Sequence, residues 1–139
     1  AYLDRTLALA ASRDIPVLFV IPPIHPGVQA RRESLGRDAE YVALVERVVG
    51  AYANAVVVDG RHAGFGPRSC FDGRHLNVDG ATALSESLAE VIAGRLDQPT
   101  SASASRWVEL PSYEAPTVRM AVQDLDESRS AVARRTARR

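Results

Sequence analysis

The chain has 139 residues, of which 46% are hydrophobic, and this is enough for one domain of ordinary size with its own core. Its 17 basic residues, all arginine, are balanced by 17 acidic residues, so the net charge excludes a strong long-range attraction to nucleic acid, an anionic membrane or an acidic substrate. The single cysteine, Cys70, excludes an intramolecular disulfide, and these features assign neither a compartment nor an oligomeric state.

The first part of the chain predicts a helix and then a buried strand. Apolar side chains recur at helical spacing over residues 2–13, which favours a helix. Residues 17–21 form a continuous apolar run bounded by Pro16 and Pro22, which is typical of a parallel strand buried on both faces. Residues 24–37 contain further turn-forming residues and several charges, so we expect a loop or lid there.

The middle of the chain predicts a helix, a second strand and a second crossover. Residues 38–53 keep their apolar side chains on one helical stripe, and residues 56–58 form a short β-branched run. Together with the first strand they make a βαβ unit, whose strands should be parallel. A glycine-rich loop over residues 60–74 then leads to a helix over residues 78–96, with Asn77 as its N-cap.

The composition changes after residue 96. Residues 97–105 are mostly small and polar and include Pro99, as in a flexible linker. Residues 107–110 are compatible with a short extended segment, and the chain ends in an arginine-rich stretch without interleaved aromatic residues. We therefore expect one domain over residues 1–96 and a linker with a weakly structured tail over residues 97–139.

The most informative motif lies just before the last predicted helix. Asp72 precedes His75 by three residues, and this pair provides two of the three groups of a hydrolytic triad. A nucleophilic serine needs a base that takes its proton, and the base needs a carboxylate that sets its tautomer and stabilises the imidazolium. The pair follows a predicted parallel strand and adjoins a helix start, a position where open α/β sheets place ligands. An exposed aspartate in a turn and a histidine that only packs there would be the structural alternative.

Residues 72–81 resemble the last motif of the SGNH, or GDSL-like, hydrolase family. That motif is an Asp-x-x-His followed by Leu-Asn and a Gly-Ala helix start, and here it is matched by Asp72, His75, Leu76, Asn77, Gly80 and Ala81. The resemblance covers roughly residues 14–96. It implies a three-layer αβα, flavodoxin-like parallel sheet and an esterase or acyl-transfer activity, with His75 as the base and Asp72 as its partner.

The other blocks of that family are not found in this sequence. The family places its serine in a Gly-Asp-Ser segment near the N-terminus and its oxyanion donors, a glycine and an asparagine, in two later blocks. The chain starts at Ala1 with a helix that follows no strand, and only two strands are predicted before residue 96, too few for a sheet with both faces covered. We therefore expect a C-terminal half of the domain, with further strands and the serine outside this chain, and no triad-based activity of this chain alone.

His25 is a further candidate for substrate binding. It follows the first predicted strand at its carboxyl end, so we expect it to line the same crevice as the motif, although loop histidines between prolines are often only surface residues. Arg31 and Arg32 lie in the same predicted loop and can reach an anionic substrate, with a solvated charge pair as the simpler explanation.

Other reactive residues are not assigned to the chemistry. Ser69 and Cys70 precede the motif, but no Gly-x-Ser-x-Gly nucleophile elbow surrounds them, and a reactive thiol needs a lowered pKa. The residue types of a metal site occur at Asp59, His62, Asp72 and His75. Their spacing matches no zinc or calcium pattern, so we expect neither a metal nor a cofactor.

The sequence thus favours part of an SGNH-like serine esterase that acts on ester bonds, including O-acetyl groups, of a small ester or an acylated carbohydrate. We expect no nucleic-acid partner, and no apolar run approaches the roughly 20 residues that span a bilayer, so we expect no transmembrane segment in this chain. The alternative is a non-catalytic SGNH-like or Rossmann-like binding or assembly module. A third, weaker hypothesis makes the basic tail an adaptor for an acidic partner.

Overall fold

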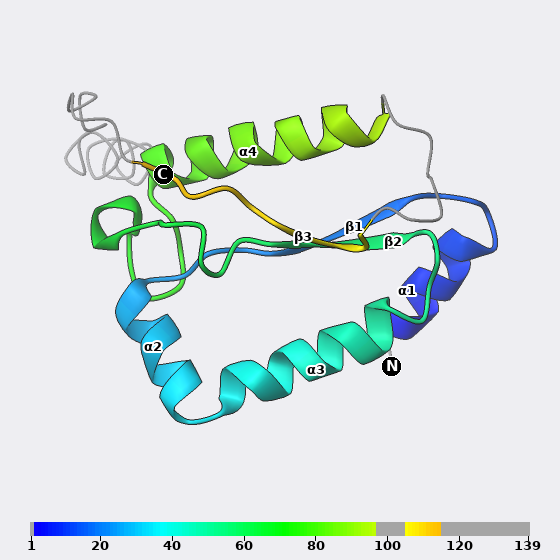
Figure 1. Cartoon of the computed structure of the whole chain (residues 1–139), viewed down its shortest axis with the longest axis horizontal. Coiled ribbons are helices and arrows are strands. Elements are labelled where there is room, and N and C mark those ends of the chain that lie inside the picture. Colours follow the sequence, from blue (N-terminus) through cyan, green and yellow to red (C-terminus); the bar gives the residue numbers. More distant parts are fainter. Residues whose placement is uncertain (1, 97–104, 115–139) are drawn as a thin grey trace, which may run out of the picture.

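The computed structural model describes residues 2–96 and 105–114, which form an α/β fold around a small parallel sheet (Figure 1). The strands are β1 (Val17–Ile21), β2 (Ala55–Asp59) and β3 (Trp107–Glu109). The helices are α1 (Tyr2–Ala11), α2 (Pro26–Ser34), α3 (Arg37–Val49) and α4 (Val78–Leu96), and a short 3-10 turn, η1 (Pro67–Ser69), precedes α4.

The sheet has the order β1-β2-β3, and both strand pairs are parallel. β1 and β2 align along their whole length, from Val17 opposite Ala55 to Ile21 opposite Asp59. Because parallel strands need a crossover, the two helices α2 and α3 carry the chain from β1 to β2, and α4 carries it from β2 to β3. The predicted βαβ arrangement is therefore confirmed.

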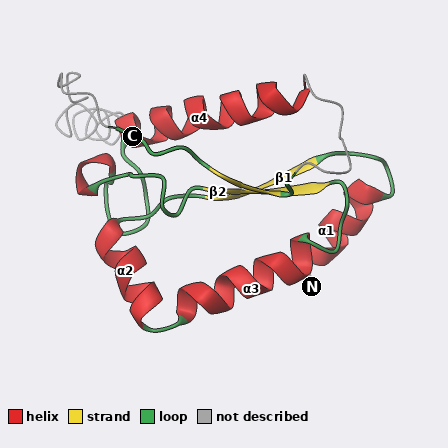
Figure 2. Ribbon diagram, viewed as in Figure 1, coloured by secondary structure: helices red, strands yellow, loops and turns green. Residues whose placement is uncertain are grey.

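Helices cover both faces of the sheet, with α4 on one side and α1 and α3 on the other (Figure 2). Successive side chains of a strand point to opposite faces, and the core is accordingly divided in two. On the side of α1 and α3, the buried residues are Leu7, Ile21, Val45, Val49, Ala55 and Val57. On the side of α4, the buried residues are Val58, Ala63, Phe65 and Leu110, and α4 adds the half-buried Leu84, Leu88 and Val91.

The prediction of a loop over residues 24–37 is wrong, because α2 occupies most of it. Pro26 is the first residue of α2, where its missing N–H costs nothing and its fixed φ suits a helix. The side chain of His25 caps this helix by accepting a hydrogen bond from the backbone N–H of Gly27. The turn between α2 and α3 is made by Gly36, whose φ of 72° lies in the left-handed region.

The packed part of the chain extends beyond residue 96, where the sequence suggested that the domain ends. β3 pairs with β2, and Leu110 directly after it is 6% exposed. The rings of Phe65 and Tyr113 stack with their centroids 4.8 Å apart. Residues 97–104 of the predicted linker and residues 115–139 of the predicted tail lie outside the described residues. Within the described part of the chain, no helix combines the length and the apolar character needed to cross a membrane.

A matched pair of leucines on α1 tests the packing of this helix. Leu7 is 1% exposed against the sheet, whereas Leu9 on the same helix is 53% exposed. Leu7→Ala should lower the free energy of unfolding by about 2–5 kcal/mol, because it leaves a cavity in the core. Leu9→Ala should change it by less than about 0.5 kcal/mol. Urea unfolding followed by circular dichroism measures both, and equal effects would contradict this packing.

Candidate functional site

The candidate site lies at the carboxyl edge of the sheet, where the loops after β1 and β2 meet the turn that precedes α4 (Figure 1). The backbone N–H of Gly60, just after β2, donates to the carbonyl of Ile21 at the end of β1. A methyl group added at Gly73 would lie 3.2 Å from Cγ2 of Val28 on α2, so the turn that carries Asp72 packs closely on this helix. The parallel sheet thus brings segments far apart in the sequence to one edge.

Asp72 and His75 point toward each other within this turn. The carboxylate oxygen Oδ1 of Asp72 accepts hydrogen bonds from the backbone N–H groups of Arg74 (2.7 Å) and His75 (2.8 Å). The second oxygen, Oδ2, lies 2.8 Å from Nδ1 of His75. The side chains are 73% exposed for His75 and 47% exposed for Asp72, so the pair is open to solvent. The geometry expected of the base half of a triad is present.

The start of α4 holds this turn in place. Oδ1 of Asn77 accepts from the backbone N–H of Gly80, so Asn77 caps the helix as predicted. Its Nδ2 donates to the carbonyl of Arg68, and its backbone N–H donates to the carbonyl of Ser69. A Cβ atom at Gly80 would lie 2.3 Å from the carbonyl oxygen of Ser69, so the close approach of α4 to η1 requires a glycine there.

The charge of Asp72 determines which ring nitrogen of His75 is free to accept a proton. The hydrogen bond from His75, followed by those from the backbone N–H groups of Arg74 and His75, lowers the pKa of Asp72 from 3.8 to about 2. The Asp72 carboxylate is therefore ionised at neutral pH and can only accept, so Nδ1 of a neutral His75 carries the proton. The lone pair is then on Nε2, to which no other residue in the ranges 2–96 and 105–114 is hydrogen-bonded.

Neither Ser69 nor Cys70 has the properties of a nucleophile for His75. Ser69 is 5% exposed and lies under the start of α4. Burial raises the pKa of the Cys70 thiol, and the negative charge of Asp72 raises it further, so the reactive thiolate is disfavoured. The structure therefore does not support Ser69 or Cys70 as the nucleophile.

His25 has a structural contact at the start of α2. Its Nδ1 accepts a hydrogen bond of 3.1 Å from the backbone N–H of Gly27, which leaves Nε2 as the donor of the neutral ring. It follows β1 at the carboxyl edge, as the sequence predicts, but among the described residues no hydrogen bond joins it to Asp72 or His75. Its role in substrate binding stays a prediction, and the same holds for Arg31 and Arg32.

The sequence did not predict the ion-pair network that the structure shows at the end of β2. Arg61 donates from Nη1 to Oδ2 of Asp38 and from Nη2 to Oδ2 of Asp59, the latter at 2.6 Å. Asp38 is 6% exposed and Asp59 is 5% exposed. Burial works to raise the pKa of Asp59, but the hydrogen bonds and the charge of Arg61 outweigh it, and the pKa is lowered. The network joins the first turn of α3 to the loop after β2.

The side chains of metal-binding type that lie close together in the structure are not the set considered from the sequence, which was Asp59, His62, Asp72 and His75. Asp59 is engaged by Arg61, and His75 by Asp72. In the described ranges, the group that could hold an ion is formed instead by Glu33, Asp38 and His62.

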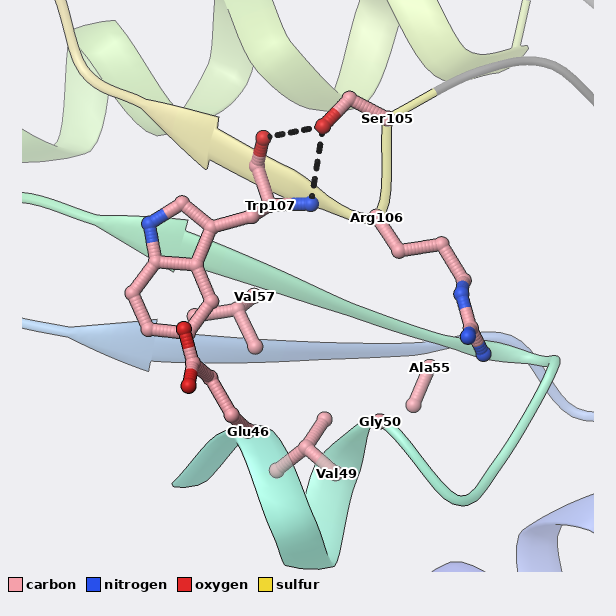
Figure 3. A pocket seen from close by; sticks show the side chains of 8 residues that line it. All are labelled: Glu46, Val49, Gly50, Ala55, Val57, Ser105, Arg106 and Trp107. Atoms are coloured by element: carbon pink, nitrogen blue, oxygen red, sulfur yellow. Dashed lines mark hydrogen bonds between the residues drawn. The ribbon is translucent and has the colours of Figure 1, made fainter. Parts of the chain in front are cut away.

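A hollow of about 280 Å³ lies at the opposite, amino edge of the sheet (Figure 3). Its lining residues are Glu46, Val49, Gly50, Ala55, Val57, Ser105, Arg106 and Trp107. The Ser105 hydroxyl is hydrogen-bonded to the backbone carbonyl of Trp107 at 2.7 Å, and its oxygen accepts from the backbone N–H of Trp107 at 3.2 Å. The hollow is therefore separate from Asp72 and His75 and contains no activated hydroxyl.

The pKa of Asp72 provides a direct test of the turn. A ¹³C NMR titration of its carboxyl carbon should give a value of about 2, and His75→Ala should raise this value while the two backbone donors keep it below 3.8. Since the folded-state pKa lies below the unfolded one, ionised Asp72 stabilises the fold above pH ~4, and this contribution is lost as the pH falls through about 2. His25→Ala is the control that leaves the titration unchanged, and a wild-type pKa near 3.8 would contradict the geometry.

Removal of Arg61 tests the ion-pair network. Arg61→Ala leaves the buried carboxylates of Asp38 and Asp59 without a cation, which should lower the free energy of unfolding by about 3–5 kcal/mol. Arg37→Ala, at an exposed arginine next to Asp38, should change it by less than about 0.5 kcal/mol. Urea unfolding at neutral pH compares the two variants, and a loss below about 1 kcal/mol for Arg61→Ala would contradict the network.

Comparison with known proteins identifies no relative, since no family model, no curated protein and no solved structure matches the chain. The family resemblance therefore depends on the residues of the Asp72–Ala81 motif alone.

Proposed function

We propose that Asp72 and His75 are the base half of a catalytic triad in a serine esterase or acyl-transfer enzyme similar to SGNH hydrolases. The observation that carries this proposal is the 2.8 Å contact between Nδ1 of His75 and Oδ2 of Asp72, at the carboxyl edge of a parallel sheet. This contact orients the imidazole, and the His75 side chain that carries the second nitrogen is 73% exposed. The substrate class is a small ester or an acylated carbohydrate.

In the proposed reaction, His75 moves one proton in two steps. A serine from a segment outside this chain attacks the ester carbonyl while Nε2 of His75 accepts the hydroxyl proton. The carboxylate of Asp72 stabilises the imidazolium that forms. Nε2 then returns the proton to the leaving alcohol. Water next attacks the acyl-enzyme while Nε2 accepts its proton, and Nε2 returns this proton to the serine as the acid is released. An acceptor alcohol in place of water would make the same step an acyl transfer.

The edge of β1 that faces away from β2 supports the proposal that the sheet is part of a larger, flavodoxin-like domain. Among the described residues β1 pairs only with β2, although all five of its residues are apolar. An apolar strand edge without a strand partner favours pairing with another strand. A further strand at this edge would bring its own carboxyl end next to the loop after β1, on the same side as His75.

A non-catalytic binding or assembly module is the second candidate. It is favoured by one observation, namely that no hydroxyl of the described ranges is hydrogen-bonded to Nε2 of His75. The same strand edge would then serve assembly. The two candidates differ in whether a serine of the intact protein is activated by His75.

Labelling with a fluorophosphonate probe distinguishes the candidates. The protein with its upstream sequence should be labelled at a serine outside this chain, and ester turnover should fall about a thousandfold or more in His75→Ala. Asp72→Asn should lower turnover about ten-thousandfold, because the ring then adopts the wrong tautomer. Asp79→Asn, at an exposed carboxylate on α4, is the matched control with unchanged turnover.

Three results would contradict this assignment. Labelling at Ser69 would move the nucleophile into the turn. A turnover of His75→Ala within tenfold of the unmodified protein would remove His75 from the mechanism. A complete absence of a labelled serine would favour the binding module.

A further inference from the structure

The turn that carries Asp72 and His75 is a short antiparallel hairpin. Its two arms form a β-bridge at Cys70 and Leu76, and the backbone N–H of Phe71 donates to the carbonyl of His75 at 2.8 Å. In an antiparallel pair, the residue after Cys70 lies opposite the residue before Leu76. Phe71 therefore faces His75 across the turn, and residues 72–74 form the loop between them.

The side chains of this hairpin alternate between an inner and an outer face. Leu76 packs against the buried cluster under α4, and its partner Cys70 is half-buried. Successive side chains of an extended segment point to opposite faces, so the next pair, Phe71 and His75, faces outward. The exposed fractions agree, at 66% for Phe71 and 73% for the His75 side chain. With Cβ atoms of opposite residues about 4.5–5.5 Å apart, the Phe71 ring borders the same surface as the imidazole.

The Phe71 ring is not part of the packing that holds the fold together. Within the described part of the chain, it belongs to neither of the two core clusters. The turn is made by its backbone N–H and by the Asp72 carboxylate, not by the phenylalanine ring. The ring can therefore be removed without loss of the Asp72–His75 contact, which makes its role open to a direct test.

The proposed reaction determines which part of the substrate lies beside Phe71. Nε2 of His75 returns a proton to the leaving alcohol, so the ester oxygen on the alcohol side must come within about 2.6–3.2 Å of Nε2. The part of the ester that leaves as the alcohol, here called the alcohol half, continues from that oxygen. The acyl half is bonded to the serine, outside this chain. Because Phe71 lies opposite His75, it borders the alcohol half and not the acyl half.

We propose that Phe71 is a specificity-determining residue that recognises the alcohol half through a flat ring. An aromatic side chain packs well against another flat apolar face, and such a pair adds to the binding beyond the area that it buries. Two sources provide this face, namely an aromatic ring and the C–H face of a sugar ring. This inference rests on the proposed function and narrows its substrate class to esters whose alcohol half carries a ring close to the ester oxygen.

Three acetates that differ only in the alcohol half test this recognition on the protein with its upstream sequence. They are ethyl acetate, which has no ring, benzyl acetate and methyl 6-O-acetylglucopyranoside, in which one carbon separates the ring from the ester oxygen. At least one of the two ring esters should be preferred over ethyl acetate. Phe71→Ala should lower this preference about tenfold, and the loss should appear in KM because the contact is made equally in the ground state and the transition state. The ring ester that responds identifies the source.

Two further variants and one measurement control this experiment. Phe71→Tyr keeps the flat ring and should keep the preference, whereas Tyr2→Ala removes an aromatic side chain that is 89% exposed on α1 and should not change it. In Phe71→Ala the pKa of Asp72 should stay at about 2, which shows that the turn is intact.

The outcomes separate this inference from the proposed function. If none of the three acetates is turned over, the proposed function fails and the role of Phe71 fails with it. If turnover occurs and depends on His75, the proposed function stands. The role of Phe71 is then overturned if neither ring ester is preferred, or if Phe71→Ala leaves the preference within about twofold of the unmodified protein.

Discussion

The parallel pairing of β1 with β2 is the constraint on which the rest of the molecule depends. Because both strands run in the same direction and in full register, from Val17 opposite Ala55 to Ile21 opposite Asp59, their carboxyl ends meet at one edge. The start of α2, the Arg61 network and the turn of Asp72 all lie near this edge. β3 extends the sheet on the other side of β2 and brings Leu110 into the core. The Arg61 network and the Asp72–His75 pair therefore lie at the same end of the described fold.

Two polar arrangements at this edge serve different purposes. In the turn before α4, a carboxylate with two backbone donors and one imidazole is held in the open, where a reacting group can approach. Next to β2, Arg61 joins two buried carboxylates, so its main effect is on stability. Ion pairs that are buried are costly to break, whereas exposed ones contribute little to stability. The exposed Asp72–His75 pair therefore contributes less to stability than the buried Arg61 network.

Local sequence signals predicted the parts of the fold whose determinants are close together in the chain. The apolar run of β1, the Asn77 cap and the Asp72–His75 contact each involve residues within a few positions, and each is found in the structure. The start of α2 was missed because Pro26 and Gly27 suggested a turn, although a proline is also favoured at the first position of a helix.

Features that depend on tertiary packing could not be predicted in the same way. The sequence indicated a short extended segment over residues 107–110, where β3 lies, but not that it pairs with β2 far earlier in the chain. Glu33, Asp38 and His62 come together from two helices and a loop, and no spacing in the sequence indicates that Glu33 and His62 meet. Arg61 and Asp59 are two positions apart, but the participation of Asp38 depends on how α3 packs beside β2.

The most direct test of the central claim is the tautomer of the His75 ring, measured by ¹⁵N NMR of the chain at a pH where the imidazole is neutral. The account predicts a protonated Nδ1 that is hydrogen-bonded to Asp72 and an unprotonated Nε2, with this preference lost in Asp72→Asn. A ring protonated mainly at Nε2, or a tautomer ratio that Asp72→Asn leaves unchanged, would contradict it.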